Sequence, residues 1–296
     1  MGGIFISVTL DHPAQALCLP GLRAPGGILY RVPPQVADRQ AGAVGANADG
    51  VPVPILMYHS ILKDPKLQGQ YILSPDELER DMIYLKEHGY TTVFVSELAD
   101  AVLEGAPLPE KPVVLSFDDG YLNNLTYVLP LLEKHDMKAV ISVVGSYSQT
   151  FSDSDDHSPA YSHLTWDDIN QLAASGRVEI GNHTYDMHRQ TPRKGAKKLQ
   201  GESGTHYRQA LLDDIGKLQQ VLKEKCGFAP TTFAYPYGYI SDDAESVLAE
   251  MGFTAALTCY EHISVIGSDP QELMNLGRFN RPAGISTEKF MKKVGI

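Results

Sequence analysis

Two adjacent carboxylates follow the clearest strand-like segment of the chain, Pro-Val-Val-Leu-Ser-Phe at 112–117. Asp118 and Asp119 end this segment and precede Gly120. Successive side chains leaving a strand point to different sides, so one carboxylate can bind a cation while the other faces a substrate. Two like charges this close raise the pKa of one carboxyl unless a metal ion or an arginine compensates. An ordinary polar turn at Asp-Gly is the alternative.

A pair of histidines follows a second strand-like segment, Arg-Val-Glu-Ile at 177–180. His183 and His188 are five residues apart, which does not place two imidazoles on one helix face, but a tight loop can bring them together. Histidine is the commonest metal ligand, and one Asp with two His leaves a fourth position for water. A histidine pair alone is more often a surface or core feature. Its place at a strand end, with the Asp pair at another, favours a metal site.

An aromatic segment, Phe-Ala-Tyr-Pro-Tyr-Gly at 233–238, ends a third strand-like run. Its rings could wall a groove against a sugar, and its Pro-Tyr-Gly turn could present a backbone N–H to a developing oxyanion. An aromatic core strand closed by a turn is the simpler alternative.

The elements that must position these residues alternate along the chain from Val51 onward. Strands are predicted at 53–59, 91–96, 112–117, 138–145, 177–183, 231–238 and 253–258, and helices at 74–89, 96–105, 122–136, 165–176, 206–227 and 241–252. Such alternation predicts parallel strands with helical crossovers, closed into a barrel or opened into a doubly wound sheet. In both folds chemistry gathers at the carboxyl ends of the strands, where all three motifs lie.

Composition limits the function classes. The 296 residues are 43% apolar and 21% charged, with a formal net charge of −11. A nucleic-acid-binding protein normally has a basic surplus, so that role is disfavoured. No apolar run reaches the length of about eighteen residues expected of a transmembrane helix. The three cysteines, Cys18, Cys226 and Cys259, cannot build a disulfide framework.

The chain is expected to divide near residue 50. Residues 1–50, which end in Ala-Gly-Ala-Val-Gly-Ala-Asn-Ala-Asp-Gly, are predicted to form an extension or linker, and residues 51–296 the folded domain that holds all three motifs. The apolar run at 3–10 has no preceding Lys or Arg and no clear cleavage site, so no intact secretory signal is visible.

The three motifs together, in this order, resemble the polysaccharide deacetylase family, also called the NodB-homology domain or carbohydrate esterase family 4. The resemblance runs from about Val53 to Val294, and the stretches most similar to family members are LMYHSI, LTWDDINQLAASGRVEIGNHT and FAYPYG. It implies that residues 51–296 are a catalytic domain, a distorted (β/α) barrel of roughly seven parallel strands with outer helices, which binds one divalent metal ion at the carboxyl ends of the strands.

The resemblance also implies roles for individual residues. Asp119, His183 and His188 are expected to bind the metal, Asp118 to act as the general base, and the Tyr237 main-chain N–H to contact the oxyanion. The ion is expected to be Zn²⁺, with Co²⁺, Ni²⁺ or Mn²⁺ as alternatives. The five-residue step between the histidines is similar to the branch acting on poly-β-1,6-N-acetylglucosamine, but it occurs in other bacterial members too.

Two family features are absent from the sequence. The usual arginine ahead of the Pro-Tyr-Gly turn is missing, because Ala234 and Tyr235 fill that region, and Arg278 in Asn-Leu-Gly-Arg-Phe-Asn-Arg-Pro is expected to orient Asp118 instead. No late Leu-x-His motif supplies the general acid, and His262 is only a weak candidate for it.

The expected function is metal-dependent removal of N-acetyl groups from a GlcNAc-containing polysaccharide, such as peptidoglycan, poly-GlcNAc or a chitin-like polymer. The alternatives are an O-acetyl esterase acting on a xylan-like polymer and a catalytically weak carbohydrate-binding pseudoenzyme. Such a substrate implies an extracellular or cell-envelope location, although a short cytoplasmic substrate is also compatible with the sequence. Neither a nucleic acid nor a protein partner is implied.

Overall fold

Parallel strands form the centre of the molecule. The structure, a computed structural model, describes residues 50–296, so nearly all of the extension expected over 1–50 lies outside the described residues. The strands are β1 (Val51–Val53), β2 (Ile55–Tyr58), β3 (Ser60–Ile61), β4 (Ile72–Leu73), β5 (Thr91–Thr92), β6 (Pro112–Phe117), β7 (Ala139–Val143), β8 (Val178–Asn182), β9 (Thr232–Ala234), β10 (Ala255–Leu257), β11 (Ser264–Ile266) and β12 (Phe279–Asn280).

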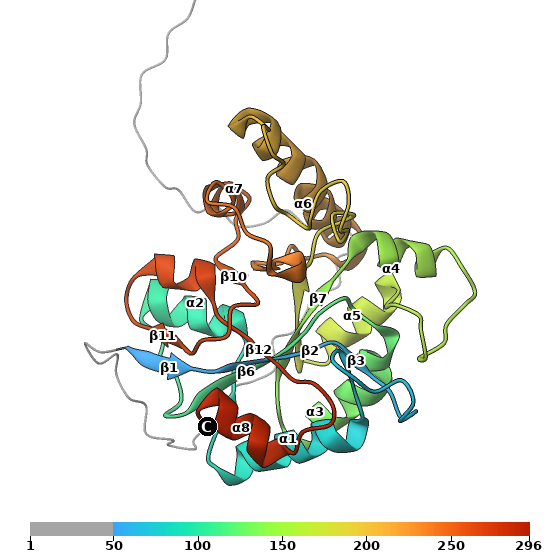
Figure 1. Cartoon of the computed structure of the whole chain (residues 1–296), viewed down its shortest axis with the longest axis vertical. Helices are drawn as coiled ribbons and strands as arrows, with labels where there is room; N and C mark the ends of the chain where they lie inside the picture. The colour runs from blue at the N-terminus through green and yellow to red at the C-terminus, as the bar shows by residue number, and fades with distance from the viewer. Residues whose placement is uncertain (1–49) are drawn as a thin grey trace, which may run out of the picture. The chain divides into compact units, whose positions relative to one another are not determined.

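Helices surround this sheet (Figure 1). They are α1 (Pro75–Glu87), α2 (Val95–Glu104), the π-helix η1 (Asn124–Val128) continued by α3 (Leu129–His135), α4 (Gly145–Ser152), α5 (Trp166–Ala174), α6 (Gly204–Cys226), the 3₁₀ turn η2 (Pro236–Gly238), α7 (Ala244–Glu250), the 3₁₀ helix η3 (Pro270–Asn275) and α8 (Thr287–Val294). Helices α1, α3 and α8 gather on one side of the sheet, and α6 and α7 on the opposite side (Figure 1).

The sheet curls into a distorted barrel, as the resemblance to the polysaccharide deacetylase family implies. Seven strands pair in the order β10-β9-β8-β7-β6-β2-β12, and the short β5 also pairs with β6. All of these pairs are parallel. At the open edge, Leu257 at the end of β10 forms a parallel bridge with Leu276, while β12 pairs with β2. The segment 276–280 therefore connects the two edges of the sheet.

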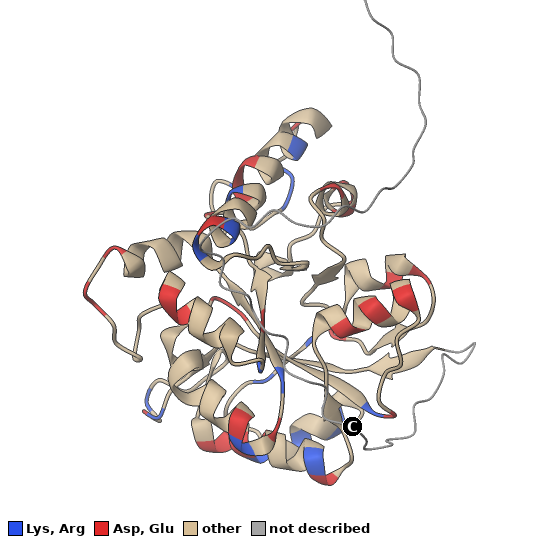
Figure 2. Ribbon diagram, turned by 180° about the vertical axis from the view of Figure 1, so that it is seen from behind, with Lys and Arg blue, Asp and Glu red and all other residues tan. Residues whose placement is uncertain are grey.

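Both faces of the central strands are buried, which explains their continuous apolar runs. Alternate residues pack into different clusters. Leu56 and Leu115 contact the core beneath α1, α3 and α5, whereas Ile55 and Val114 pack in a second core with residues of α2 and η3. Charged residues lie mostly on the outer helices and loops (Figure 2). Within residues 50–296, no helix has the length and apolar character needed to span a bilayer.

Helix ends follow the capping signals in the sequence. Ser74 and Glu77 form a capping box at the start of α1, and Pro75 occupies its first turn. Gly105 ends α2 in the left-handed conformation, with a φ of 71°.

The strand predicted at 91–96 is only two residues long. The Phe94 N–H donates to Glu97 Oε2 at 2.7 Å, which starts α2 at Val95. The helix therefore takes the last residues of the predicted strand.

A buried ion pair joins the first helix to the segment after β12. Arg281 donates to Asp81 through Nε at 2.8 Å and through Nη2 at 3.2 Å. Tyr58 and Thr287 also donate to this carboxylate, at 3.2 Å and 2.6 Å. Both charged residues are almost fully buried. Removing one partner would leave an uncompensated charge in the interior.

Arg281→Met is expected to lower the free energy of unfolding by about 3–5 kcal/mol, because Asp81 would stay buried without its cation. Urea denaturation followed by circular dichroism measures this loss. Arg208→Met serves as the control, since Arg208 pairs with Glu250 at the surface and both side chains are about half exposed. Equal losses in the two variants would contradict the prediction.

Candidate metal and catalytic site

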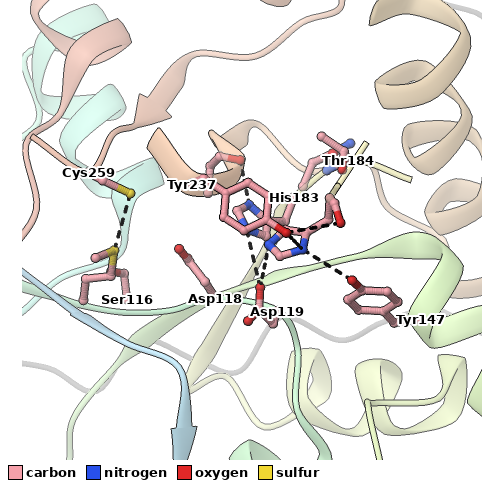
Figure 3. A network of polar contacts seen from close by, with 12 residues as sticks. Ser116, Asp118, Asp119, Tyr147, His183, Thr184, Tyr237 and Cys259 are labelled. Atoms are coloured by element: carbon pink, nitrogen blue, oxygen red, sulfur yellow. Dashed lines mark hydrogen bonds and ion pairs between the residues drawn. The ribbon is translucent and has the colours of Figure 1, made fainter. Parts of the chain in front are cut away.

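A cavity of about 580 Å³ lies at the carboxyl ends of the strands. Its walls include residues of all three sequence motifs: Asp118, Asp119, His183, His188 and Tyr237. Figure 3 shows Asp119, His183 and Tyr237 close together, with Asp118 beside them. The barrel thus brings together residues that are up to 119 positions apart in the sequence, from Asp118 to Tyr237.

Asp119, His183 and His188 form the centre of the site. Asp119 Oδ1 lies 3.1 Å from His188 Nε2 and 3.6 Å from His183 Nε2. One ligand atom from each of the three residues lies within 4.8 Å of the others. Ligands of a tetrahedral zinc ion, at about 2.0–2.1 Å from the metal, are about 3.3 Å apart, which matches these separations.

The orientation of His183 leaves a lone pair facing Asp119. His183 Nδ1 lies 2.7 Å from the Ala234 carbonyl oxygen, which can only accept, so Nδ1 carries the proton. Burial lowers the pKa of His183 to about 4, which keeps the ring neutral near pH 7. Its Nε2 is then unprotonated and faces a carboxylate oxygen. The Nε2 lone pair and the negatively charged oxygen of Asp119 repel each other, and a cation between them removes this repulsion. The three side chains therefore fit a divalent metal ion as ligands.

Two tyrosine hydroxyls surround the other nitrogen of His188. Tyr237 Oη lies 3.2 Å and Tyr147 Oη 3.4 Å from His188 Nδ1 (Figure 3). The Tyr237 ring also packs on the imidazole, with ring centroids 4.5 Å apart. Partners on the nitrogen opposite a metal fix the tautomer and the orientation of a ligand histidine.

Asp118 is held apart from the three-residue centre by Arg278. The guanidinium donates to Asp118 Oδ1 at 2.7 Å and to Oδ2 at 2.8 Å. Burial alone would raise the pKa of the Asp118 carboxyl, but Arg278 and His183 lower it further than burial raises it, so it lies below its usual value. Asp118 is therefore ionised at neutral pH. Arg278 also donates to the Thr258 carbonyl at 2.8 Å, which fixes its place in the barrel.

Backbone strain marks the same region. Four non-glycine residues in the described chain have positive φ, and three belong to this site: Asp119 (72°), Thr184 (73°) and Tyr237 (58°). Each costs on the order of 1–3 kcal/mol, and such residues cluster at functional sites. Tyr237 remains 41% exposed, so its ring forms part of the cavity rim.

The sequence leaves open whether His59, at the end of the first predicted strand, lines a groove or belongs with Tyr58 to the edge of the core. His59 directly follows β2, lines the same cavity as Asp118, and its Nδ1 is buried without a hydrogen-bond partner. Its position at the end of a predicted strand is the signal that indicates a place in the groove. His262, by contrast, is exposed, packs on Gly277, and is not among the residues that line the cavity.

The fold and the site define a distorted (β/α) barrel with a candidate mononuclear metal site of one Asp and two His. The chain belongs to the polysaccharide deacetylase family, because the family model named "Polysaccharide deacetylase" matches residues 105–256, about half of the chain. The family identified from the three motifs is thereby confirmed.

Individual relatives agree with this family. A poly-β-1,6-N-acetyl-D-glucosamine N-deacetylase of Escherichia coli K12 is 28% identical over 222 residues, which covers 69% of this chain and 33% of the relative. The putative polysaccharide deacetylase YxkH of Bacillus subtilis is 28% identical over 206 residues, covering 70% of this chain and 64% of the relative. The chain thus spans about a third of the E. coli relative and under two thirds of the B. subtilis one.

Solved structures show the same fold. A de-N-acetylase from Aggregatibacter actinomycetemcomitans superimposes with a TM-score of 0.67 at 27% identity, covering 82% of this chain and 99% of that one. The Streptococcus pyogenes deacetylase PplD also superimposes with a TM-score of 0.67, at 21% identity, covering 83% of this chain and 99% of that one.

His183→Ala is expected to abolish stoichiometric binding of a divalent metal, because it removes one of three protein donors and the ring fixed by Ala234. Metal content after dialysis against zinc, together with titration calorimetry, measures the loss. Asp118→Asn is the matched control, since that side chain contacts Arg278 and lies outside the three-residue cluster. Wild-type zinc content in His183→Ala would refute the assignment of this ligand.

Proposed function

We propose that the protein is a metal-dependent de-N-acetylase of GlcNAc-containing polysaccharides. The observation that carries this proposal is one cavity holding Asp119, His183 and His188 beside a carboxylate, Asp118, that Arg278 keeps ionised. Family membership and the E. coli relative's name support the same reaction.

The three donors, one carboxylate and two imidazoles, suit Zn²⁺, and they leave a coordination position for water or substrate. A zinc ion bound there supplies Lewis-acid chemistry, which lowers the pKa of a water molecule to about 7 and polarises an amide carbonyl. Asp119 and His183 are buried or nearly so, so their geometry is fixed before a substrate arrives.

Asp118 is the proposed general base. It takes a proton from the attacking water as the water oxygen bonds to the acetyl carbonyl carbon. Arg278 holds both carboxylate oxygens of Asp118 in place and compensates for the burial of the charge. Such proton transfer contributes about 10²–10⁴-fold to the rate. The Tyr237 main-chain N–H is the proposed donor to the oxyanion, where a lost donor typically costs about 3–4 kcal/mol.

His59 is the proposed general acid. When the carbon–nitrogen bond breaks, its imidazolium donates a proton to the leaving amine of the sugar, and acetate and a free amine result. Burial lowers the pKa of His59, while the negative charges of Asp118 and Asp119 oppose that lowering and so stabilise the imidazolium that this step requires. Arg278 thus supplies the arginine, and His59 the general acid, that are missing from the sequence motifs. Their presence favours a hydrolase over a pseudoenzyme.

The cavity also suits a sugar polymer. Tyr71, which is 52% exposed, and Tyr237 offer aromatic faces at its rim, against which the apolar face of a pyranose can pack. A polymeric substrate of this kind implies that the protein works outside the cell or in its envelope.

The variants Asp118→Asn and His59→Ala are expected to distinguish the role of the general base from that of the general acid. Asp118→Asn should slow hydrolysis of both an N-acetyl sugar and an activated aryl acetate by about 10²–10⁴-fold, since both need a base. His59→Ala should slow the amide by a similar factor but the aryl ester much less, because a phenolate leaves without a proton. Rate constants for both substrates measure the difference. Equal effects of His59→Ala on the two substrates would overturn its role as acid.

The function itself is tested by amine and acetate release from acetylated glycans. We expect amine release from β-linked GlcNAc oligomers, at least tenfold faster than acetate release from O-acetylated xylan, and loss of activity after chelation with recovery on adding Zn²⁺. Acetate release from xylan alone would favour the esterase alternative. Sugar binding without acetate release from any of the glycans would favour the pseudoenzyme.

A further inference from the structure

The loop between the two histidines lies beyond the end of β8 and is not part of a strand. His183 directly follows β8 and its ring is fixed by the Ala234 carbonyl, whereas His188 lies five residues further on in a loop. Along a regular helix, five residues would turn the two side chains about 140° apart. The loop must therefore fold back for both Nε2 atoms to face Asp119.

One carboxylate accepts backbone hydrogens of this loop. Asp214, on α6, accepts from the Tyr185 N–H at 2.8 Å through Oδ1 and from the Asp186 N–H at 3.0 Å through Oδ2. Burial raises the pKa of the Asp214 carboxyl, while backbone hydrogen bonds from Tyr185, Asp186 and Met187 oppose that rise. Successive N–H groups that converge on one anion form a concave binding site. In this loop the anion is a side chain of the same protein.

The opposite side of the loop is held by the start of α4. The Gly145 and Ser146 N–H groups donate to the carbonyls of Thr184 at 3.1 Å and Tyr185 at 2.6 Å. A Cβ at Gly145 would lie 2.5 Å from Tyr185 Cδ2, so the close approach of α4 requires glycine. Two carbonyl groups of the loop thus accept hydrogen bonds from the start of α4, and two of its N–H groups donate to Asp214.

Asp214 does not cap its own helix. It lies in the middle of α6, away from both helix ends. The preceding residue, Asp213, is exposed and accepts from Gln209 one turn earlier on the same helix. Asp213 therefore has the same charge and nearly the same helix position as Asp214 without contacting the loop.

We infer that Asp214 is a positioning residue for the metal site. Its carboxylate holds residues 185–187 in the turn that brings His188 to Asp119 and His183, and it contacts neither substrate nor metal itself. The inference rests on the proposed function, since it requires that these three residues bind a metal. Groups that support metal ligands typically change metal affinity by 10–100-fold.

Asp214→Asn tests this role, because the amide replaces one acceptor with an NH₂ group that cannot accept from a backbone N–H. We expect the Kd for Zn²⁺ to rise at least tenfold in titration calorimetry, and the visible absorption bands of the Co²⁺-loaded protein to shift as the coordination changes. Asp213→Asn is the matched control and should keep the wild-type Kd and spectrum. The melting temperature and circular dichroism of each metal-free variant report whether it folds.

Asp214→Glu keeps both acceptors but moves them by one methylene. A positioning role predicts weaker Zn²⁺ binding here too, by a smaller factor than in Asp214→Asn. This variant decides the question if Asp214→Asn does not fold. Wild-type affinity and Co²⁺ spectrum in every folded variant would overturn the inference while leaving the proposed function intact. A wild-type protein that binds no divalent metal would instead overturn the proposed function and the inference together.

Discussion

The buried contact between Asp118 and Arg278 is the interaction on which the site depends. Asp118 and Asp119 are neighbours in sequence, and two carboxylates this close cannot both stay ionised in a buried site without compensation. Arg278 neutralises the first through two hydrogen bonds, while the second faces two imidazoles and a position suited to a metal ion. The two neighbouring carboxylates therefore have separate environments, since Asp118 pairs with a guanidinium and Asp119 faces the two histidines.

The barrel supplies these partners from distant parts of the chain. The carboxylates follow β6, the histidines follow β8, and Arg278 directly precedes β12. Parallel strands place all their carboxyl ends on one side, so side chains far apart in sequence meet there without long loops. The bridge between Leu257 and Leu276 continues this arrangement across the open edge and fixes the backbone just ahead of Arg278. The segment 276–280 thus both closes the sheet and carries the arginine that keeps Asp118 ionised.

Much of this architecture follows from local sequence patterns, whereas the supporting contacts do not. The buried run at 112–117 and the Ser74 capping box predict β6 and α1, because the signals lie within the elements themselves. For His59 the strand end is a signal that leaves two interpretations open, groove lining or core edge, and only the pairing of β2 beside β6 decides between them. The role of Asp214 cannot be predicted from the sequence. This residue lies in a regular helix next to an equivalent aspartate, and only the fold brings it to the loop at 185–187.

The order of the segments along the chain has a consequence for biosynthesis. Asp119, His183 and His188 all leave the ribosome well before Arg278, and a domain generally folds as a unit. The guanidinium that compensates the charge of Asp118 therefore emerges after Asp118, Asp119 and both histidines, together with the segment that closes the sheet.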